Sequence, residues 1–73
     1  MTKQEMFELA VNLYILIITE PDQGVAHVRK VKEELSAKGQ WEQFAAQIMQ
    51  GMQGDDFNHR VRTEAEQRME AND

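Results

Sequence analysis

The amino-acid sequence predicts an all-α protein, a small bundle of three to four short helices forming a single domain over residues 1–73. The chain is long enough for one small domain, and its hydrophobic content of 41% is above the range of disordered chains. Apolar side chains recur every three or four residues in four successive segments, which indicates helices. Only residues 13–19 have a composition that favours a strand, and no second segment could pair with them.

The first helix is predicted over residues 2–19. Thr2 and Glu5 have the spacing of a capping box, in which a hydroxyl and a carboxylate bind the first free backbone amides. Apolar residues follow on nearly every side of this segment, and a helix of that kind is buried on more than one side. They are Met6, Phe7, Leu9, Ala10, Val11, Leu13, Tyr14, Ile15, Leu16, Ile17 and Ile18.

The second helix is predicted over residues 20–38. Thr19 is a candidate N-cap, and Pro21 is acceptable only in a first turn. Gly24 weakens this start, so the break between the helices could extend to it. Gly39 follows the helix as a C-terminal stop. One apolar stripe is expected to face the core: Val25, Val28, Val31 and Leu35.

Two further helices are predicted over residues 40–53 and 55–70, with residues 66–73 frayed at the end of the chain. Asp55 or Asp56 can cap the last helix. The apolar face of the third helix contains Trp41, Phe44, Ala45, Ile48, Met49 and Met52. The fourth helix has Phe57, Val61, Ala65 and Met69 at a spacing of four.

Composition excludes several classes of protein. The 13 acidic and 8 basic residues give a net charge of −5, and the absence of cysteine excludes disulfides, thiolate zinc sites and thiol catalysis. The longest apolar stretch, residues 10–18, is shorter than the roughly 20 residues of a membrane-spanning helix. Glu5 and Glu8 precede it where a signal peptide would be positive. We therefore expect a soluble, cytoplasmic protein.

No catalytic, cofactor or metal site is expected. The few hydroxyl-bearing residues show no spacing of a nucleophile with a base. Asp55 and His59 lie four residues apart, a spacing that can hold a metal ion, but two ligands do not make a site. An aspartate at a helix start is more simply a cap. The chain is therefore predicted not to be an enzyme.

Small size makes association the main functional expectation. Below about 70–80 residues a single core gives little stability, and small proteins usually add disulfides, a metal or oligomerisation. The first two are not expected here, so a homodimer or another protein partner remains. A helix that is apolar all round also leaves surplus apolar surface. The expected self-association residues are Tyr14, Ile15, Leu16 and Ile18.

Partner binding is assigned to the third helix and to the basic cluster of the second. On the third helix, Phe44 and Ile48 should be core, whereas residues nearer the ends should stay partly exposed. The basic cluster is either the solvated face of an amphipathic helix or a contact for an acidic surface. The partner-binding candidates are Trp41, Met49, Met52, Arg29, Lys30 and Lys32.

The favoured function is that of a small acidic module that binds another protein and modulates or inhibits it, as phage and mobile-element accessory proteins do. One alternative is a nucleic-acid role, either DNA binding through residues 27–38 or acidic mimicry of DNA. A recognition helix over residues 40–53 would contain no lysine or arginine and would carry Glu42 near its start, so nucleic acid is a disfavoured partner. A second alternative is a structural assembly subunit.

Overall fold

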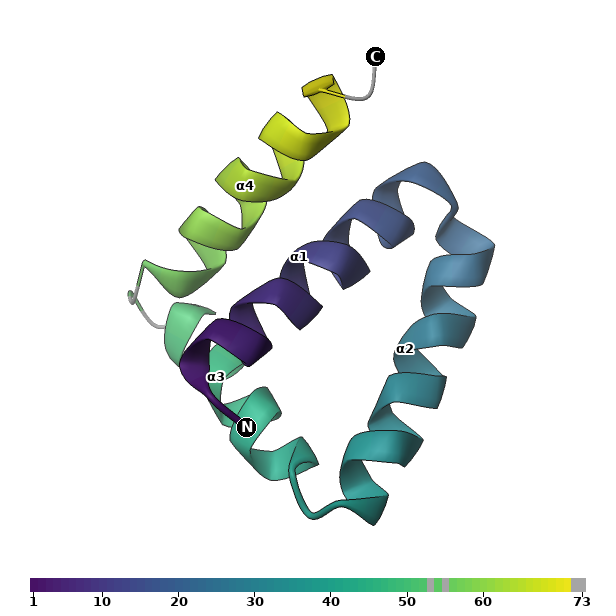
Figure 1. The fold of residues 1–73 in the computed structure, drawn as a ribbon, viewed down its shortest axis with the longest axis vertical. Coiled ribbons are helices and arrows are strands. Elements are labelled where there is room, and N and C mark those ends of the chain that lie inside the picture. The colour runs from purple at the N-terminus through teal and green to yellow at the C-terminus, as the bar shows by residue number, and fades with distance from the viewer. Residues whose placement is uncertain (53, 55, 72–73) are drawn as a thin grey trace.

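The computed structural model describes residues 1–52, 54 and 56–71. Over these residues the chain forms four helices and no strand, which confirms the all-α prediction (Figure 1). Each observed boundary lies within two residues of the predicted one. The helices are α1 (Lys3–Thr19), α2 (Pro21–Ala37), α3 (Trp41–Met52) and α4 (Phe57–Ala71).

Helix α1 lies between α2 and α4 and packs against both (Figure 1). α2 returns antiparallel to α1, whereas α4 runs in the same direction as α1. α3 connects the two outer helices and packs against both of them. It runs across the beginning of α1 rather than alongside it, and the Gln43 side chain donates a hydrogen bond to the Met1 carbonyl at 2.9 Å.

The capping box predicted at the start of α1 is confirmed. The Glu5 backbone N–H donates to the Thr2 hydroxyl at 3.1 Å, and the Thr2 backbone N–H donates to the Glu5 carboxylate at 3.0 Å. Hydrogen bonding of the Glu5 carboxylate with the Thr2 backbone, and then with the Thr2 side chain, holds the pKa of Glu5 below its ordinary value. The ionised carboxylate is therefore part of the helix start.

The turn between α1 and α2 differs from expectation in two ways. The Thr19 hydroxyl donates to the Ile15 carbonyl at 2.8 Å, so it does not cap α2; the N-cap is Glu20, whose side chain makes no capping bond. Gly24 does not interrupt the helix but is buried within it. A Cβ at this position would lie 2.7 Å from the Ile17 Cα, so only glycine allows the two backbones to approach this closely.

The end of α2 agrees with the predicted stop. Gly39 has a φ of 72°, a left-handed conformation that favours glycine. The Gln40 N–H donates to the Leu35 carbonyl at 2.8 Å, and the Gly39 N–H donates to the Ser36 carbonyl at 3.1 Å. This is the Schellman pattern, which satisfies free carbonyls at the helix end and turns the chain into α3.

All four helices contribute to one core. The Phe7 and Phe57 rings meet edge to face at 6.1 Å and join α1 to α4. Phe44 is buried as predicted, but Ile48 is only half-buried, and Val25, expected in the inner stripe of α2, is 51% exposed. The buried hydrophobic residues among those described are Met6, Ala10, Val11, Leu13, Val31, Leu35, Phe44, Phe57, Val61 and Ala65.

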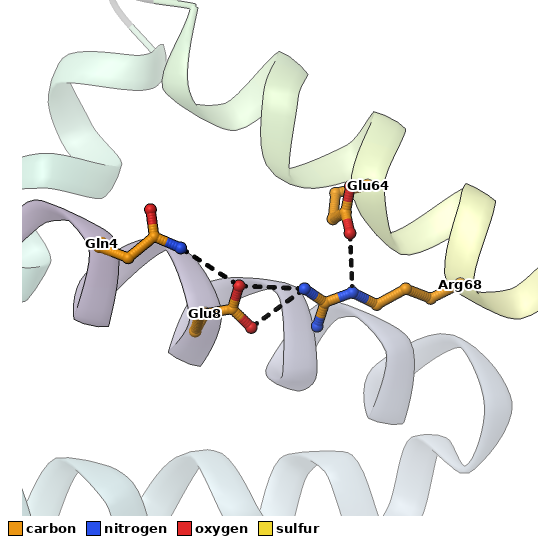
Figure 2. Close-up of polar contacts among 4 residues, drawn as sticks. All are labelled: Gln4, Glu8, Glu64 and Arg68. Atoms are coloured by element: carbon orange, nitrogen blue, oxygen red, sulfur yellow. Dashed lines mark hydrogen bonds and ion pairs between the residues drawn. The ribbon is translucent and has the colours of Figure 1, made fainter.

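Arg68 links α4 to α1 through charge (Figure 2). Its Nη2 donates to both Glu8 oxygens at 3.0 Å, and its Nε donates to Glu64 at 2.9 Å. The hydrogen bonds with Glu64 and then Glu8 raise the pKa of Arg68. α4 continues beyond this residue to Ala71. The fraying expected for residues 66–73 stays a prediction, and its last two residues lie outside the described part of the chain.

Candidate protein-binding groove

An apolar cleft of about 500 Å³ lies between the helices. Its floor is one side of α1, where four residues at helical spacing point into it: Ala10, Leu13, Tyr14 and Ile17. Val28 of α2 lines it as well, and α3 contributes Phe44 and Ile48. From α4 come Asn58, Val61 and Arg62. We call this cleft the groove.

The groove is open because α3 covers only the first half of α1. Ala10 and Leu13 of the floor, in the middle of α1, are buried, whereas Ile17 near its end is 42% exposed. α3 is held at the beginning of α1 by the bond from Gln43 to Met1, and at α4 by Asn58, whose amide donates to the Ile48 carbonyl at 3.1 Å. No other described helix lies over the second half of the floor.

Exposed apolar side chains extend from the groove to the turn between α1 and α2. Beside Ile17, Ile18 is 50% exposed, and Val25 on the first turns of α2 is 51% exposed. Contiguous apolar surface of this kind marks interaction sites more often than scattered single residues do. The groove and this turn are therefore a candidate interaction surface.

The predicted self-association residues do not share one surface. Tyr14 lines the groove, Ile15 packs against the core, Leu16 is half-buried and Ile18 is exposed. Ile17 lines the groove but was not among the predicted site residues. Its spacing of three and four residues from Tyr14 and Leu13 was a usable signal, but which side of an all-apolar helix stays open depends on where α3 lies.

Two of the three partner-binding candidates on α3, Trp41 and Met49, do not line the groove. Trp41 is half-buried, with its ring 6.0 Å from that of Phe44 and the Lys32 ammonium 5.8 Å from its centroid, a cation–π contact between α2 and α3. Met49 is 58% exposed and does not line the groove. The side chain of Met52 lies outside the described part of the structure.

The three basic candidates on α2 are exposed and form no ion pair within the described residues. Lys32 is four residues after Val28 and therefore lies on the groove side of α2. Arg29 is three residues before Lys32 and continues the same edge. Lys30 lies on the opposite side of the helix, because each residue turns by about 100°.

Arg62 is the charged residue in the groove wall. Its Nε donates to Glu66 at 3.0 Å, and this bond, together with the nearby Tyr14, raises the pKa of Arg62. No carboxylate is present among the described residues that line the groove. Although the chain as a whole is acidic, the charged side chain among the described groove residues is the basic Arg62.

Within the described residues, no group of three or more histidine, aspartate or glutamate side chains is placed to hold a metal ion, and Asp55 of the predicted pair with His59 lies outside them. None of the described helices combines the length and apolar character needed to cross a membrane. Comparison with known protein families, curated proteins and solved structures found no match.

Proposed function

We propose that this chain is a small interaction module that binds a partner protein through the groove and thereby modulates or inhibits that partner. The observation that carries the proposal is the open apolar cleft of about 500 Å³, which continues onto Ile18 and Val25 at the adjacent turn. Grooves between helices commonly receive an apolar segment of another protein. The absence of cysteine suits a reducing compartment, so we place this activity in the cytoplasm.

A second candidate is a structural subunit that assembles with copies of itself, for example as a homodimer. The exposed Ile18 and Val25 favour it, since they lie outside the groove lining and would be covered by a copy. Self-association would also add stability to a domain of this size. The two candidates differ in what the groove contacts inside the cell.

A nucleic-acid role has less support. Arg29 and Lys32 lie on one edge of α2 and Lys30 on the opposite side, so the three cations do not form one basic patch that faces a single direction. A protein that neutralises fewer phosphates binds DNA more weakly and with a smaller salt dependence. We expect no binding to duplex DNA at physiological salt, as measured by fluorescence anisotropy.

Site-specific photocrosslinking in cells that encode the chain tests the proposal. Benzoylphenylalanine replaces Ile17 in one variant and Lys30, on the opposite side of α2, in a matched control. Crosslinks from position 17 to a different protein, and none from position 30, support a partner in the groove. Crosslinks only to further copies of the chain support the assembly subunit. An absence of crosslinks from position 17 contradicts both candidates.

A further inference from the structure

The charges around the groove indicate what kind of segment it binds. The chain has a net charge of −5, yet the described groove lining contains Arg62 and no carboxylate. Along the α2 edge, Lys32 and Arg29 add two more positive charges. Glu66 pairs with Arg62, so the attraction for a negatively charged segment comes from Lys32 and Arg29 on the α2 edge.

The cations of α2 and α4 differ in how far they are neutralised. On α4, Arg60, Arg62 and Arg68 each pair with a carboxylate of the chain itself. On α2, Arg29 and Lys32 have no such partner within the described residues. The α2 edge therefore carries the charge that a bound molecule could still pair with.

The shape and chemistry of the groove favour a helix as its occupant. The walls and floor are helical, so their backbone groups are already paired and offer no edge to an extended strand. The lining is mainly apolar, so a bound segment must satisfy its own backbone hydrogen bonds, as a helix does. Its apolar residues would follow one face at intervals of three and four.

We propose that the groove binds an amphipathic helix of another protein, with the apolar face of that helix on Leu13, Tyr14 and Ile17. Acidic side chains at one flank of the bound helix contact Lys32 and Arg29. This inference rests on the proposed function and adds the chemistry of the partner. Because the Lys32 ammonium lies 5.8 Å from the Trp41 ring, a carboxylate that draws Lys32 away also alters the fluorescence of this single tryptophan.

A displayed peptide library tests the inference on the full-length folded chain. Its peptides are about 18 residues long and have leucines at helical spacing. The positions along both sides of this apolar face are a random choice of Glu, Gln or Lys. Selected peptides should have Glu in excess of Lys on one flank. The double variant Arg29→Glu/Lys32→Glu should weaken the best Glu peptide by about tenfold or more and shift selection toward Lys. Binding is measured by titration of Trp41 fluorescence and by calorimetry.

Two controls separate the possible results. Lys30→Glu introduces the same kind of charge change on the opposite side of α2, and it should leave peptide affinity within about twofold of the wild type. Ile17→Lys places a charge in the groove floor at a partly exposed position and should abolish binding. Circular dichroism of each variant confirms that it is folded before its affinity is compared.

The outcomes distinguish failure of the inference from failure of the proposed function. Peptides that need Ile17 but show no preference for Glu, or a preference that Arg29→Glu/Lys32→Glu leaves unchanged, overturn the acidic helix and leave the groove as a binding site. If no peptide depends on Ile17, both are overturned. A chain that is dimeric in solution, and that binds peptide only after dissociation, identifies a second copy as the occupant and also overturns the inference.

Discussion

Helices α2 and α4 both pack against α1, but they do so by different means. α4 buries Phe57, Val61 and Ala65, and its Arg68 binds Glu8 of α1. α2 approaches α1 most closely through a glycine, Gly24, and leaves the neighbouring valine half exposed. The arginines of α4 pair with carboxylates of the chain, whereas no ion pair forms at the Arg29–Lys32 cluster of α2 among the described residues.

Both helices contribute to the core, since α2 buries Val31 and Leu35. They differ in their cations, which α4 pairs within the chain and α2 leaves without a carboxylate partner among the described residues. Pairing a cation within the chain uses its hydrogen-bonding capacity and fixes its side chain. An unpaired cation beside an apolar groove keeps that capacity for a ligand. Removing side chains from α4 should therefore reduce stability, while removing exposed side chains from α2 should change binding more than folding.

The largest effect on stability is expected for Phe57→Ala. This change removes the ring between α1 and α4, where Phe57 is only 1% exposed, and leaves a cavity. Truncation of a buried phenylalanine typically costs about 3–5 kcal/mol, a large part of the stability of a small domain. Urea denaturation followed by circular dichroism measures it. The matched change on α2, Val25→Ala, should stay within about 0.5 kcal/mol of the wild type. A comparable loss for Val25→Ala would mean that α2 is covered in solution by another copy.

The next effect concerns the contact between α1 and α2. Gly24→Ala places a methyl group 2.7 Å from the Ile17 Cα, a backbone atom that cannot move aside alone. The helices must separate, at a cost of about 1–3 kcal/mol, despite the better helix propensity of alanine. Gln23→Ala, next to it and exposed, should be neutral or slightly stabilising. Equal or higher stability of Gly24→Ala would contradict the close approach.

A smaller effect distinguishes the arginines of the two helices. Arg68→Ala should lower the thermal midpoint, because it removes the link from Glu64 to Glu8, whereas Arg29→Ala should leave the midpoint unchanged. The difference should shrink in about 1 M salt, since these side chains are partly exposed. A double-mutant cycle with Glu8→Ala isolates the contact between α1 and α4. A coupling energy of zero would show that the contact does not stabilise the fold.

The smallest effect lies at the start of α1, the helix that both α2 and α4 pack against. Hydrogen bonds from Thr2 lower the pKa of Glu5 in the folded state below its ordinary value of 4.5. The resulting stabilisation is therefore complete above pH 4.5 and is lost as pH falls through the lowered pKa. Thermal midpoints of wild type and Glu5→Gln should differ at neutral pH and converge in acid, because only the wild-type side chain loses its charge there. A constant difference across this range would exclude the ionised Glu5 as its source.

The four helices could be predicted because their ends carry local signals. Thr2 with Glu5, Pro21 and Gly39 each act on the backbone of their own turn, so their effect does not depend on the rest of the fold. The role of Gly24 could not be predicted in this way. Within its own segment a glycine is only a poor helix former, and its value here comes from Ile17 on a different helix.

The candidate site was predictable only in outline. An all-apolar first helix indicated surplus apolar surface, but the position of the groove depends on α3 crossing α1 near its start. The exposure of Val25 has a similar reason. The spacing of apolar residues along α2 predicts which side of the helix faces the core, but it does not predict how far the neighbouring helices extend along that side. The separation of Lys30 from Lys32 was available from helix geometry alone, since they lie two residues apart.

The contact between Gly24 and Ile17 has a consequence beyond stability. Ile17 is both the residue that Gly24 touches and part of the groove floor, so the size of the residue at position 24 sets how far α2 stands from that floor. A larger side chain there would widen the mouth of the groove and move Lys32 and Arg29 outward together. Variation at this one buried position would thus change the width of the groove while every lining side chain stays the same.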